Sequence, residues 1–385
     1  MSPSAPRILF YVQHLLGIGH LKRAALIAEA LTQAGMEVHL VQGGLPSPVR
    51  FNVKACYQLP PVTCCNADFS NLVDPQGVPI DASYRQQRAE QLLQITAAIQ
   101  PDLLLIELFP FGRRQFRFEL LPLLEQARSQ GIPTACSLRD ILVQKSTPHP
   151  KREEETVAYV EQYFNRVLVH SDPSLVTLEQ SCPFTHRIRH KLSYTGYVAD
   201  SGSSPSTPRP REGVVVSAGG GAVGYPLLEA IVQCKGETSL ANQPWTLITG
   251  PGLDDVRFSR LQQVALKAGI VVERFRDDFV SLLAKSSLSI SQAGYNTTME
   301  VLATATPALV IPYGEGGETE QRQRSEILQR KGLIQWLPAD SLRPEILAPA
   351  IDRAAQQSPP PLSIDLSGAH TTARLLQDML QEVGP

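Results

Sequence analysis

Short apolar runs alternate with longer amphipathic stretches along most of the chain. In the first half, the apolar runs predict strands buried on both faces, at residues 7–12, 38–42, 103–107, 133–138 and 167–170. The stretches between them predict helices, at residues 21–34, 83–100, 120–129 and 151–164. Residues 44–80 are rich in proline and are expected to be irregular. The alternation predicts an α/β fold with a parallel sheet, helices on both faces and right-handed connections.

The alternation stops at residues 200–212, where serine, proline and glycine dominate, so we expect an interdomain linker there. It resumes with predicted strands at 214–217, 245–249, 270–273, 288–291 and 308–311 and ends in a predicted helix at 369–382. The expected organisation is an N-terminal domain (1–199), the linker (200–212), a C-terminal domain (213–368) and a final helical segment (369–385), with packing of that helix on the N-terminal domain as one option. Two such halves place a ligand cleft at the carboxyl ends of their strands.

Composition narrows the class of protein. A chain of 385 residues is too long for one ordinary core, which supports two domains. The formal net charge of −2 argues against a nucleic-acid-binding protein. No apolar run approaches the roughly 20 residues of a membrane helix, and residues 1–6 form a short polar lead rather than a signal peptide. The six cysteines form no CxxC pair and lack metal-ligand spacing with histidine. We therefore expect a cytoplasmic protein with no metal and no cofactor.

The segment 289–333 carries the clearest chemical signal. A buried strand (288–291) meets a helix (296–304) through a turn of small residues that includes Gly294. Backbone N–H groups at a helix start, among them those near Asn296 and Thr297, suit a diphosphate. Glu300, one turn later, is placed to chelate ribose hydroxyls. Glu320 and Gln321 open the next helix, where they could hold a polyhydroxyl ring, so the segment predicts a nucleotide-sugar site.

This segment resembles the donor-binding half of family 28 glycosyltransferases, which have the GT-B fold. The matching elements are Gly294, Thr297, Glu300, residues 309–312, Glu320-Gln321 and Lys331-Gly332. The family includes the N-acetylglucosaminyltransferase of peptidoglycan synthesis and the monogalactosyldiacylglycerol synthases. The resemblance implies two Rossmann-like parallel-sheet domains facing across a cleft, with Glu300 on the ribose and Glu320-Gln321 against the donor sugar. This chain departs from the family, which usually has Asp-Gln or Gln-Gln at the last pair.

Two further features of the second half fit a donor site. Gly219, Gly220 and Gly221 follow a predicted strand and leave backbone N–H groups that can cradle phosphate oxygens, although a flexible hinge is the alternative. The same glycine-rich loop is present in the family. Phe275 follows the strand at 270–273, where the resemblance implies a contact with uracil; ordinary core packing is the alternative.

The first strand leads through a loop with Gly17 and Gly19 to His20 at a helix start. The two glycines permit a tight turn close to a ligand, and an imidazole there can take the proton of an acceptor hydroxyl. His14 is a second candidate. The alternative is a helix start with a partly exposed histidine; the resemblance favours the catalytic role because related enzymes have a glycine-rich loop ending in histidine here.

Two carboxylates lie at predicted strand ends in the same half. Glu107 is expected to orient His20 or to contact acceptor hydroxyls, and Asp140 to act as an acceptor-side carboxylate or helper base. Ion pairs are the alternative for both: Glu107 with Arg113 or Arg114, and Asp140 with Arg139.

A run of phenylalanine and arginine between residues 109 and 118 could lie on an anionic membrane surface and help deliver a lipid-linked acceptor. The alternative is a helix entrance whose aromatic side chains belong to the core. The residues are Phe109, Phe111, Arg113, Arg114, Phe116, Arg117 and Phe118.

These observations predict an inverting, metal-independent glycosyltransferase that moves a sugar from a nucleotide-sugar, with UDP implied by the resemblance, to a hydroxyl acceptor. The expected partners are the donor, which acts as co-substrate, and a small-molecule or lipid-linked acceptor. The expected location is the cytoplasm or the inner face of the membrane. A UDP-sugar 2-epimerase of the same fold and a non-catalytic nucleotide-sugar-binding protein are the alternatives.

Overall fold

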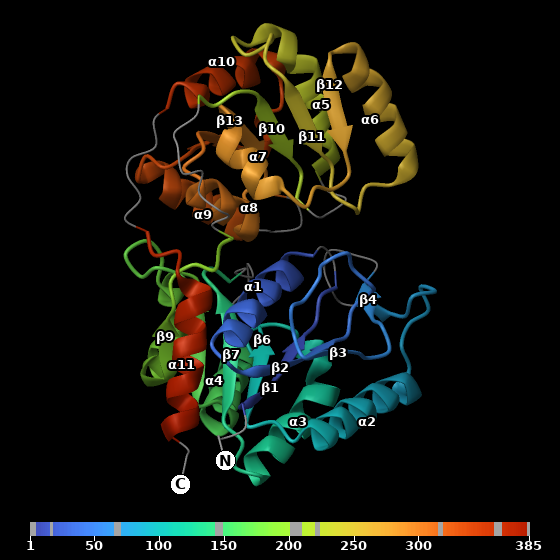
Figure 1. Ribbon diagram of the computed structural model, residues 1–385, viewed down its shortest axis with the longest axis vertical. Coiled ribbons are helices and arrows are strands. Elements are labelled where there is room, and N and C mark those ends of the chain that lie inside the picture. The colour runs from blue at the N-terminus through green and yellow to red at the C-terminus, as the bar shows by residue number, and fades with distance from the viewer. Residues whose placement is uncertain are drawn as a thin grey trace. The chain divides into compact units, whose positions relative to one another are not determined.

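The computed structural model describes residues 5–15, 18–64, 71–142, 149–200, 210–219, 224–314, 319–357 and 364–382. Three predicted site residues, Gly17, Gly220 and Gly221, lie outside these ranges, as do most of the predicted linker and residues 315–318. The chain divides into two compact units (Figure 1). Unit 1 comprises Met1–Val198 and Ile364–Pro385, and unit 2 comprises Ala199–Ser363.

The sheet of unit 1 is parallel throughout. Among the described residues its strand order is β3-β2-β1-β6-β7-β8-β9, where the strands are β1 (Arg7–Val12), β2 (Glu37–Gln42), β3 (Ala55–Gln58), β6 (Leu103–Glu107), β7 (Thr134–Arg139), β8 (Arg166–His170) and β9 (Leu192–Tyr194). From β1 the chain continues through β2 to β3 at one edge of the sheet. It then returns to β6, on the other side of β1, and continues through β7 and β8 to β9 at the opposite edge. A short antiparallel pair, β4 (Thr63–Cys64) and β5 (Leu72–Val73), is separate from this sheet.

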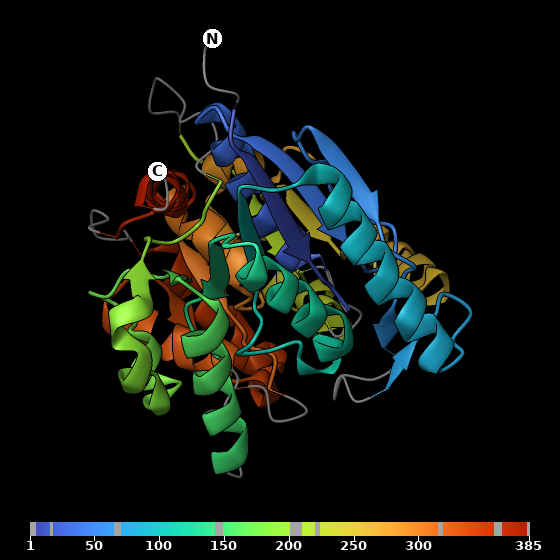
Figure 2. The same ribbon diagram turned by 90° about the horizontal axis from the view of Figure 1, so that it is seen from below.

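Strand residues of unit 1 alternate between two cores, as the twofold periodicity of a strand requires. On one face Leu9 and Tyr11 of β1 pack in a cluster with buried residues of helices α2 (Ala82–Ile99), α3 (Arg117–Ser129) and α4 (Pro150–Tyr163). On the other face Ile8 and Phe10 pack with helices α1 (Gly19–Gln33) and α11 (Gly368–Glu382). The neighbouring helices α2 and α3 can be followed in Figure 2. Because both faces are covered, the strands are apolar almost without interruption.

The C-terminal helix α11 completes unit 1. It lies along α1, and Leu376 and Met379 enter the same core as the β1 residues (Figure 1). The backbone before α11 docks tightly, because an added Cβ at Gly368 would lie 2.5 Å from the carbonyl oxygen of Gly196. The N–H of Tyr197 also donates to the carbonyl of Asp365 at 2.8 Å. The final helix is therefore a structural part of the first unit.

Unit 2 repeats the arrangement with a second parallel sheet. Its order among the described residues is β12-β11-β10-β13-β14-β15, with β10 (Val214–Ser217), β11 (Trp245–Ile248), β12 (Ile270–Glu273), β13 (Leu288–Ser291), β14 (Ala308–Val310) and β15 (Gln335–Trp336). In chain order this is 3-2-1-4-5-6, the order of a Rossmann-type dinucleotide-binding fold.

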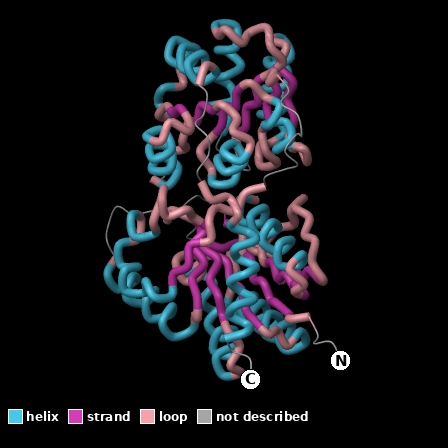
Figure 3. The backbone as a smooth tube through the Cα atoms, turned by 60° about the vertical axis from the view of Figure 1, so that its left-hand side comes forward, coloured by secondary structure: helices cyan, strands magenta, loops and turns pink. Residues whose placement is uncertain are grey.

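Helices lie on both sides of this second sheet as well (Figure 3). Buried residues of α5 (Tyr225–Cys234), α6 (Asp255–Lys267) and α10 (Pro344–Ala355) share one cluster with Val214, Val216 and Ile290. The remaining helices are α7 (Phe279–Lys285), α8 (Tyr295–Ala303) and α9 (Glu320–Arg330). Among the described residues, no helix combines the length and the apolarity that crossing a membrane requires.

The expected α/β class and parallel sheets are confirmed, and the strand at 103–107 has the predicted bounds. The prediction that 44–80 is irregular is wrong in part, since β3 extends the sheet there. Its residues alternate between half-buried and exposed, so it lacks the apolar run that marked the central strands. The edge strands β9 and β15 were missed because neither contains a fully buried residue.

A buried polar network holds the helices of unit 1 to the end of β1. Arg88 on α2 and Glu119 on α3 are both fully buried and form a bidentate pair, with Nε–Oε2 and Nη2–Oε1 distances of 2.7 Å. The hydroxyl of Tyr11 donates to Glu119, and Arg88 donates to Gln13 Oε1 at 2.9 Å and to the carbonyl of Gly43 at 3.1 Å. A charged pair of this kind fixes how α2 and α3 meet the strand ends, because either charge alone would be buried without compensation.

We predict that Glu119→Ala lowers the free energy of unfolding of unit 1 by about 3–5 kcal/mol, since it leaves the Arg88 charge buried without its partner. Urea denaturation followed by circular dichroism measures the change. The control is Glu125→Ala in the same helix, because Glu125 pairs with Arg128 at the surface. An equal decrease in the free energy of unfolding in the two variants would show that the buried Arg88–Glu119 pair contributes no more than a surface pair.

Candidate active site

The strand order marks one position in each unit where the direction of winding reverses. Parallel sheets of this type bind ligands at the carboxyl ends of the two strands that flank the reversal. In unit 1 these strands are β1 and β6, and in unit 2 they are β10 and β13. His20 and Glu107 lie at the first position, and Gly219 and Gly294 at the second. These four predicted site residues thus lie in the places where the topology favours binding.

In unit 1 the structure brings His20 and Glu107 into contact. His20 is the second residue of α1, and Glu107 is the last residue of β6. The distance from His20 Nδ1 to Glu107 Oε1 is 2.7 Å. Arg23, one turn further along α1, donates to the same carboxylate oxygen. The side chains of Arg23 and Glu107 are 3% and 1% exposed and that of His20 is 15% exposed, so only the histidine reaches the surface.

Burial and neighbouring charges set the protonation states of this group. Burial lowers the pKa of His20 to about 4, with Arg113 and Arg23 acting in the same direction and Glu107 opposing them. Burial alone would raise the pKa of Glu107, but the adjacent His20, Arg23 and Arg113 lower it to about 2. Near neutral pH the group therefore consists of a neutral imidazole, an ionised carboxylate and a charged guanidinium.

The protonation states also assign the tautomer of His20. An ionised carboxylate can only accept, so the proton of the neutral imidazole is on Nδ1, which donates to Glu107. Nε2 then carries a lone pair and can accept a proton. The arrangement is that of a general base oriented by a carboxylate: Glu107 holds Nδ1, and Nε2 is the nitrogen that can act as the base.

The loop after β1 packs around this group. Arg113 has a left-handed backbone conformation (φ 55°) and donates from Nε to the carbonyl of Gln13 at 2.8 Å. His14 is buried; burial lowers its pKa and the charge of Arg113 lowers it further. An added Cβ at Gly44 would lie 2.3 Å from the His14 ring, so this ring is tightly enclosed. His14 is therefore placed for packing more than for catalysis.

Asp140 and His170 continue the same edge of the sheet. Asp140 follows β7 and is fully buried, and His170 ends β8. Both ring nitrogens of His170 are engaged, by Ser137 Oγ at 2.8 Å and by Thr195 Oγ1 at 2.9 Å. Burial lowers the pKa of His170 to about 3, with a further contribution from Arg23. The structure thus brings Glu107 to His20 and leaves Asp140 one strand further along the edge.

In unit 2 the reversal point is built from small residues. Ser217 of β10 and Ser291 of β13 are directly opposite each other in the register. Gly219 follows with φ 70°, a conformation that favours glycine. Gly294 precedes α8, which begins at Tyr295 without a side-chain cap. The predicted strand-to-helix turn is therefore present, with the start of α8 at the carboxyl edge of the sheet.

Helix α8 carries the other predicted donor residues. Asn296 and Thr297 are half-buried in its first turn, and Glu300 is buried with 8% exposure on its next turn. Beside them, the hydroxyls of Ser291 and Thr298 are buried and make no hydrogen bond within the described residues. Buried hydroxyls normally have a partner, so these two mark a polar lining at the start of α8.

Arg324 of α9 pairs with Glu320 of its own helix and reaches the turn before α8. Arg324 donates to Glu320 Oε1 at 2.7 Å and to the carbonyl of Ala293 at 2.9 Å, and it lies over the ring of Tyr295 at 5.6 Å. Gln321 Oε1 accepts the N–H of Tyr313 at 3.0 Å. Arg324 therefore holds the turn before α8, Glu320 pairs with Arg324, and a sugar contact would have to share the Glu320 carboxylate with Arg324.

Phe275 is 37% exposed and follows β12, the edge strand on the far side of β11 from β10. The preceding residue, Arg274, packs over Phe258 at 4.1 Å and donates to the carbonyl of Leu253 at 2.6 Å. Partial exposure leaves Phe275 able to contact a planar ligand.

The phenylalanine and arginine run divides into two groups. Phe109 and Phe116 are fully buried, and Phe111 and Phe118 pack against the same core. These aromatic side chains are therefore core residues, in line with the interpretation of this run as a helix entrance and not as a membrane surface. Arg117 is exposed and Arg114 is largely buried, and both interact with Glu155.

Arg23 and Arg324 are the residues that sequence reasoning missed. Each is a buried arginine spaced three or four residues from an acid or histidine of its own helix. An arginine on the apolar face of an amphipathic helix is the signal, because it requires a buried acceptor. Its partner cannot be read from the sequence when, as for Glu107, it comes from a distant strand.

Known proteins resemble this chain in sequence over part of its length and in fold over nearly all of it. Residues 214–369 match the glycosyltransferase family 28 C-terminal domain. Two relatives are each named as a UDP-N-acetylglucosamine–N-acetylmuramyl-(pentapeptide) pyrophosphoryl-undecaprenol N-acetylglucosamine transferase. That of Synechococcus sp. (strain JA-2-3B'a(2-13)) is 31% identical over 28% of this chain and 31% of its own. That of Gloeobacter violaceus is 31% identical over 39% of this chain and 40% of its own. The chain thus spans well under half the length of these relatives.

Solved structures match over the whole chain. The glycotransferase of kitacinnamycin superimposes with a TM-score of 0.60 at 15% identity, covering 100% of both chains. MurG of Acinetobacter baumannii gives a TM-score of 0.57 at 15% identity, covering 98% of this chain and 99% of the other. At this level of identity the likeness concerns the fold.

Fold and site together define a two-unit α/β protein of the GT-B class. Residues 214–369, mostly in the second unit, are similar to the glycosyltransferase family 28 C-terminal domain, the family whose motifs the sequence resembles. Within the described residues, no three His, Cys, Asp or Glu side chains are grouped to hold a metal ion.

The buried histidines predict a pH dependence of stability. Unfolded histidines titrate near 6.5, whereas His20 and His170 remain neutral in the folded protein down to about 4 and 3. The unfolded state therefore binds more protons below pH 6.5, and the free energy of unfolding falls as the pH decreases towards 4. One fully titrating histidine contributes about 1.4 kcal/mol per pH unit. His20→Gln should reduce the slope by about that amount.

Urea denaturation between about pH 4.5 and pH 6 measures this slope, because stability falls throughout that interval. His370→Gln is the control, since His370 lies exposed on α11. A slope unchanged by His20→Gln would show that His20 is not held neutral in the folded protein.

Proposed function

We propose that the chain is an inverting, metal-independent glycosyltransferase that transfers a sugar from a UDP-sugar to a hydroxyl acceptor. The observation that carries the proposal is the contact of His20 with Glu107, which presents a neutral imidazole nitrogen at the reversal point of unit 1. The family match of unit 2 supplies the donor half of the argument.

Unit 2 would bind the donor at the start of α8. The backbone near Gly219 and Gly294 and the positive end of the α8 dipole are suited to a diphosphate. The resemblance assigns Glu300 to the ribose hydroxyls, and the buried Glu300 and Thr298 side chains on α8 give this helix polar groups for such a ligand. Phe275 would contact the base. The solved structure of LpCGTa in complex with UDP shares the fold, with a TM-score of 0.59 at 13% identity.

The proposed chemical step is a direct displacement. His20 Nε2 accepts the proton of the acceptor hydroxyl while its oxygen forms a bond to the anomeric carbon. The bond from that carbon to the diphosphate oxygen breaks, and UDP leaves with the electron pair. Attack from the side opposite the leaving group inverts the anomeric centre. Glu107 stabilises the imidazolium that forms, and Arg23 holds Glu107 in place.

Charge on the leaving diphosphate would be stabilised by preorganised dipoles. The α8 start and the glycine N–H groups supply positive potential without a metal ion, and fixed dipoles need no reorganisation as the charge develops. Asp140, buried one strand from Glu107, is proposed as an acceptor-side carboxylate.

The acceptor is proposed as a small or lipid-linked molecule with a free hydroxyl. The relatives' names specify a pyrophosphoryl-undecaprenol acceptor, and we propose the same chemical type here without its identity. Work at the inner face of a membrane would follow from a lipid-linked acceptor. Contact with the membrane would then involve surface arginines, because the phenylalanines of residues 109–118 belong to the core.

We predict that UDP stabilises the protein. Glu300→Ala should raise the Kd for UDP at least tenfold, because the ribose loses its carboxylate partner. A ligand at 100 times its Kd adds about 2.7 kcal/mol, which a thermal unfolding scan detects. The control is Glu345→Ala, which removes an exposed carboxylate from α10 of the same unit. Stabilisation by another nucleoside diphosphate in place of UDP would contradict the uracil assignment.

Turnover distinguishes the enzymatic alternatives. With a panel of UDP-sugars, a transferase releases UDP faster when an acceptor is added, whereas a 2-epimerase changes the sugar without an acceptor. Loss of both activities in a protein that still binds UDP would leave a non-catalytic binding role and contradict the proposal.

The pH–rate profile tests the base. If His20 acts as a neutral base, kcat/KM should fall on the acid side near pH 4 instead of near 6.5. Arg23→Met should move this limb to higher pH, because the charge of Arg23 lowers the pKa of His20. Glu107→Gln should move it to lower pH, because Glu107 raises that pKa. Shifts of the same sign in both variants would contradict the assignment.

A further inference from the structure

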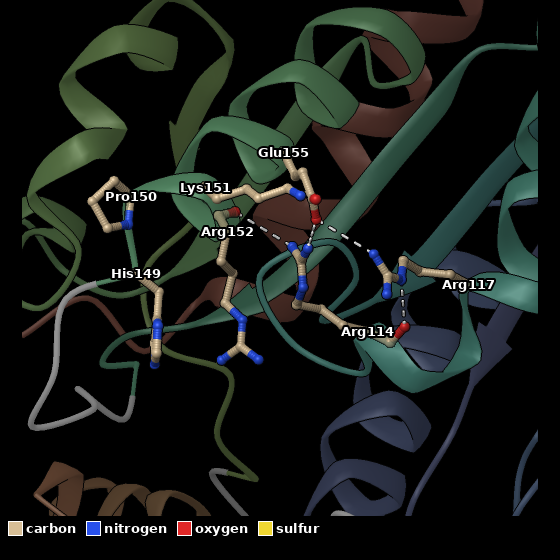
Figure 4. A pocket seen from close by; sticks show the side chains of 7 residues that line it. All are labelled: Arg114, Arg117, His149, Pro150, Lys151, Arg152 and Glu155. Carbon is tan, nitrogen blue, oxygen red and sulfur yellow. Dashed lines mark hydrogen bonds and ion pairs between the residues drawn. The ribbon is translucent and has the colours of Figure 1, made fainter.

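A concave site lies in unit 1, between the start of α4 and the segment that leads into α3. It is a pocket of about 370 Å³, at the lower end of the roughly 300–1,000 Å³ typical of ligand sites. The lining residues are Arg114, Arg117, His149, Pro150, Lys151, Arg152 and Glu155. Figure 4 shows Arg114 and Arg117 directed towards Glu155, with His149 and Arg152 extending from the start of α4.

The position of Arg114 is fixed by the first turns of α4. Its Nη2 donates to Glu155 Oε2, and its Nη1 donates to Thr156 Oγ1 at 3.1 Å and lies 3.4 Å from the carbonyl oxygen of Arg152. Arg117 Nη1 approaches the same Glu155 oxygen at 3.4 Å. Two guanidinium groups from one side of the pocket are thus oriented before any ligand arrives, which lowers the entropy lost on binding.

The pocket has more positive charge than its own acid can balance. Four cations, Arg114, Arg117, Lys151 and Arg152, face one carboxylate, Glu155, so the formal charge is 4 − 1 = +3 with His149 neutral. Burial lowers the pKa of Arg114, and repulsion from Arg117 and Arg152 lowers it further against the opposing effect of Glu155. Such a concentration of charge stands out in a chain whose net charge is −2. A multiply charged anion would relieve this repulsion.

The start of α4 adds to the positive potential in the pocket. The helix begins at Pro150 and its preceding residue, His149, makes no side-chain cap. The positive end of the helix dipole therefore faces the same region as the cationic side chains. Arginine guanidinium groups match the oxygens of phosphate groups, and a phosphate bound here would share Arg114 and Arg117 with Glu155.

We infer that this pocket binds a phosphate or diphosphate group. The inference does not depend on the proposed glycosyl transfer, because the pocket is built from unit 1 residues other than His20, Glu107 and Arg23. Two sources present this chemistry: a soluble phosphorylated compound, or the phosphate headgroups of a membrane lipid.

Isothermal titration with inorganic pyrophosphate at low salt tests the site. Lys151→Glu should weaken binding at least tenfold, because it reverses a charge in the pocket on an exposed side chain that folding does not require. Lys267→Glu is the matched control: it makes the same change in net charge on an exposed residue at the end of α6 in unit 2. Binding lost in the first variant and retained in the second supports the inference.

Other results of the titration would overturn it. Absence of pyrophosphate binding in the wild-type protein, an affinity unchanged by Lys151→Glu, or equal loss in both variants would show that the pocket holds no phosphate group. In the unchanged case, the observed binding would belong to another part of the chain, such as the proposed donor site.

Co-sedimentation with vesicles distinguishes the two sources. Vesicles of phosphatidylcholine with phosphatidylglycerol are compared with phosphatidylcholine alone, for the wild type and both variants. Sedimentation that requires the anionic lipid and is lost in Lys151→Glu assigns the phosphate to a membrane headgroup. Pyrophosphate binding together with no vesicle binding assigns it to a soluble compound, and each result supports the shared chemistry.

Discussion

Parallel pairing of the strands is the constraint on which this structure depends. Parallel neighbours require a crossover, which here is supplied mainly by helices, and the helices cover both faces of each sheet. All carboxyl ends of a sheet then meet at one edge, where residues from distant parts of the chain come together. Glu107 and His20 are 87 positions apart and are in contact for this reason. The same rule brings Ser217 beside Ser291 in unit 2.

The central strands and most helices could be predicted from the sequence because burial on both faces demands unbroken apolar runs. The edge strands β3, β9 and β15 could not, since half-exposed residues carry no such pattern. For the site, the sequence indicated that His20 and Glu107 stand near strand ends, and the topology made their contact a reasonable expectation. It did not reveal Arg23, because the demand for a buried cation arises only when the carboxylate of Glu107 is enclosed.

Buried charge is used in a consistent way in both units. In unit 1 Arg23 holds Glu107, and Arg88 holds Glu119 beside the end of β1. In unit 2 Arg324 holds Glu320 and the turn before α8. Each arginine fixes a loop or helix at the functional edge of its sheet. These pairs add modest stability compared with apolar packing but strongly penalise any arrangement that separates them. They keep the site geometry specific where the backbone is made of glycine and small polar residues.

The first unit is discontinuous in sequence, because α11 follows the whole of unit 2 and packs against α1. This order has a consequence for biosynthesis. Unit 2 is a single continuous segment, so its whole core has been synthesised before the end of the chain is reached. Unit 1 is not complete at that point, because the core around Ile8 and Phe10 stays open until Leu376 and Met379 have been translated. The half that is synthesised first is therefore completed last. A nascent chain most needs a chaperone while this apolar face of unit 1 is exposed.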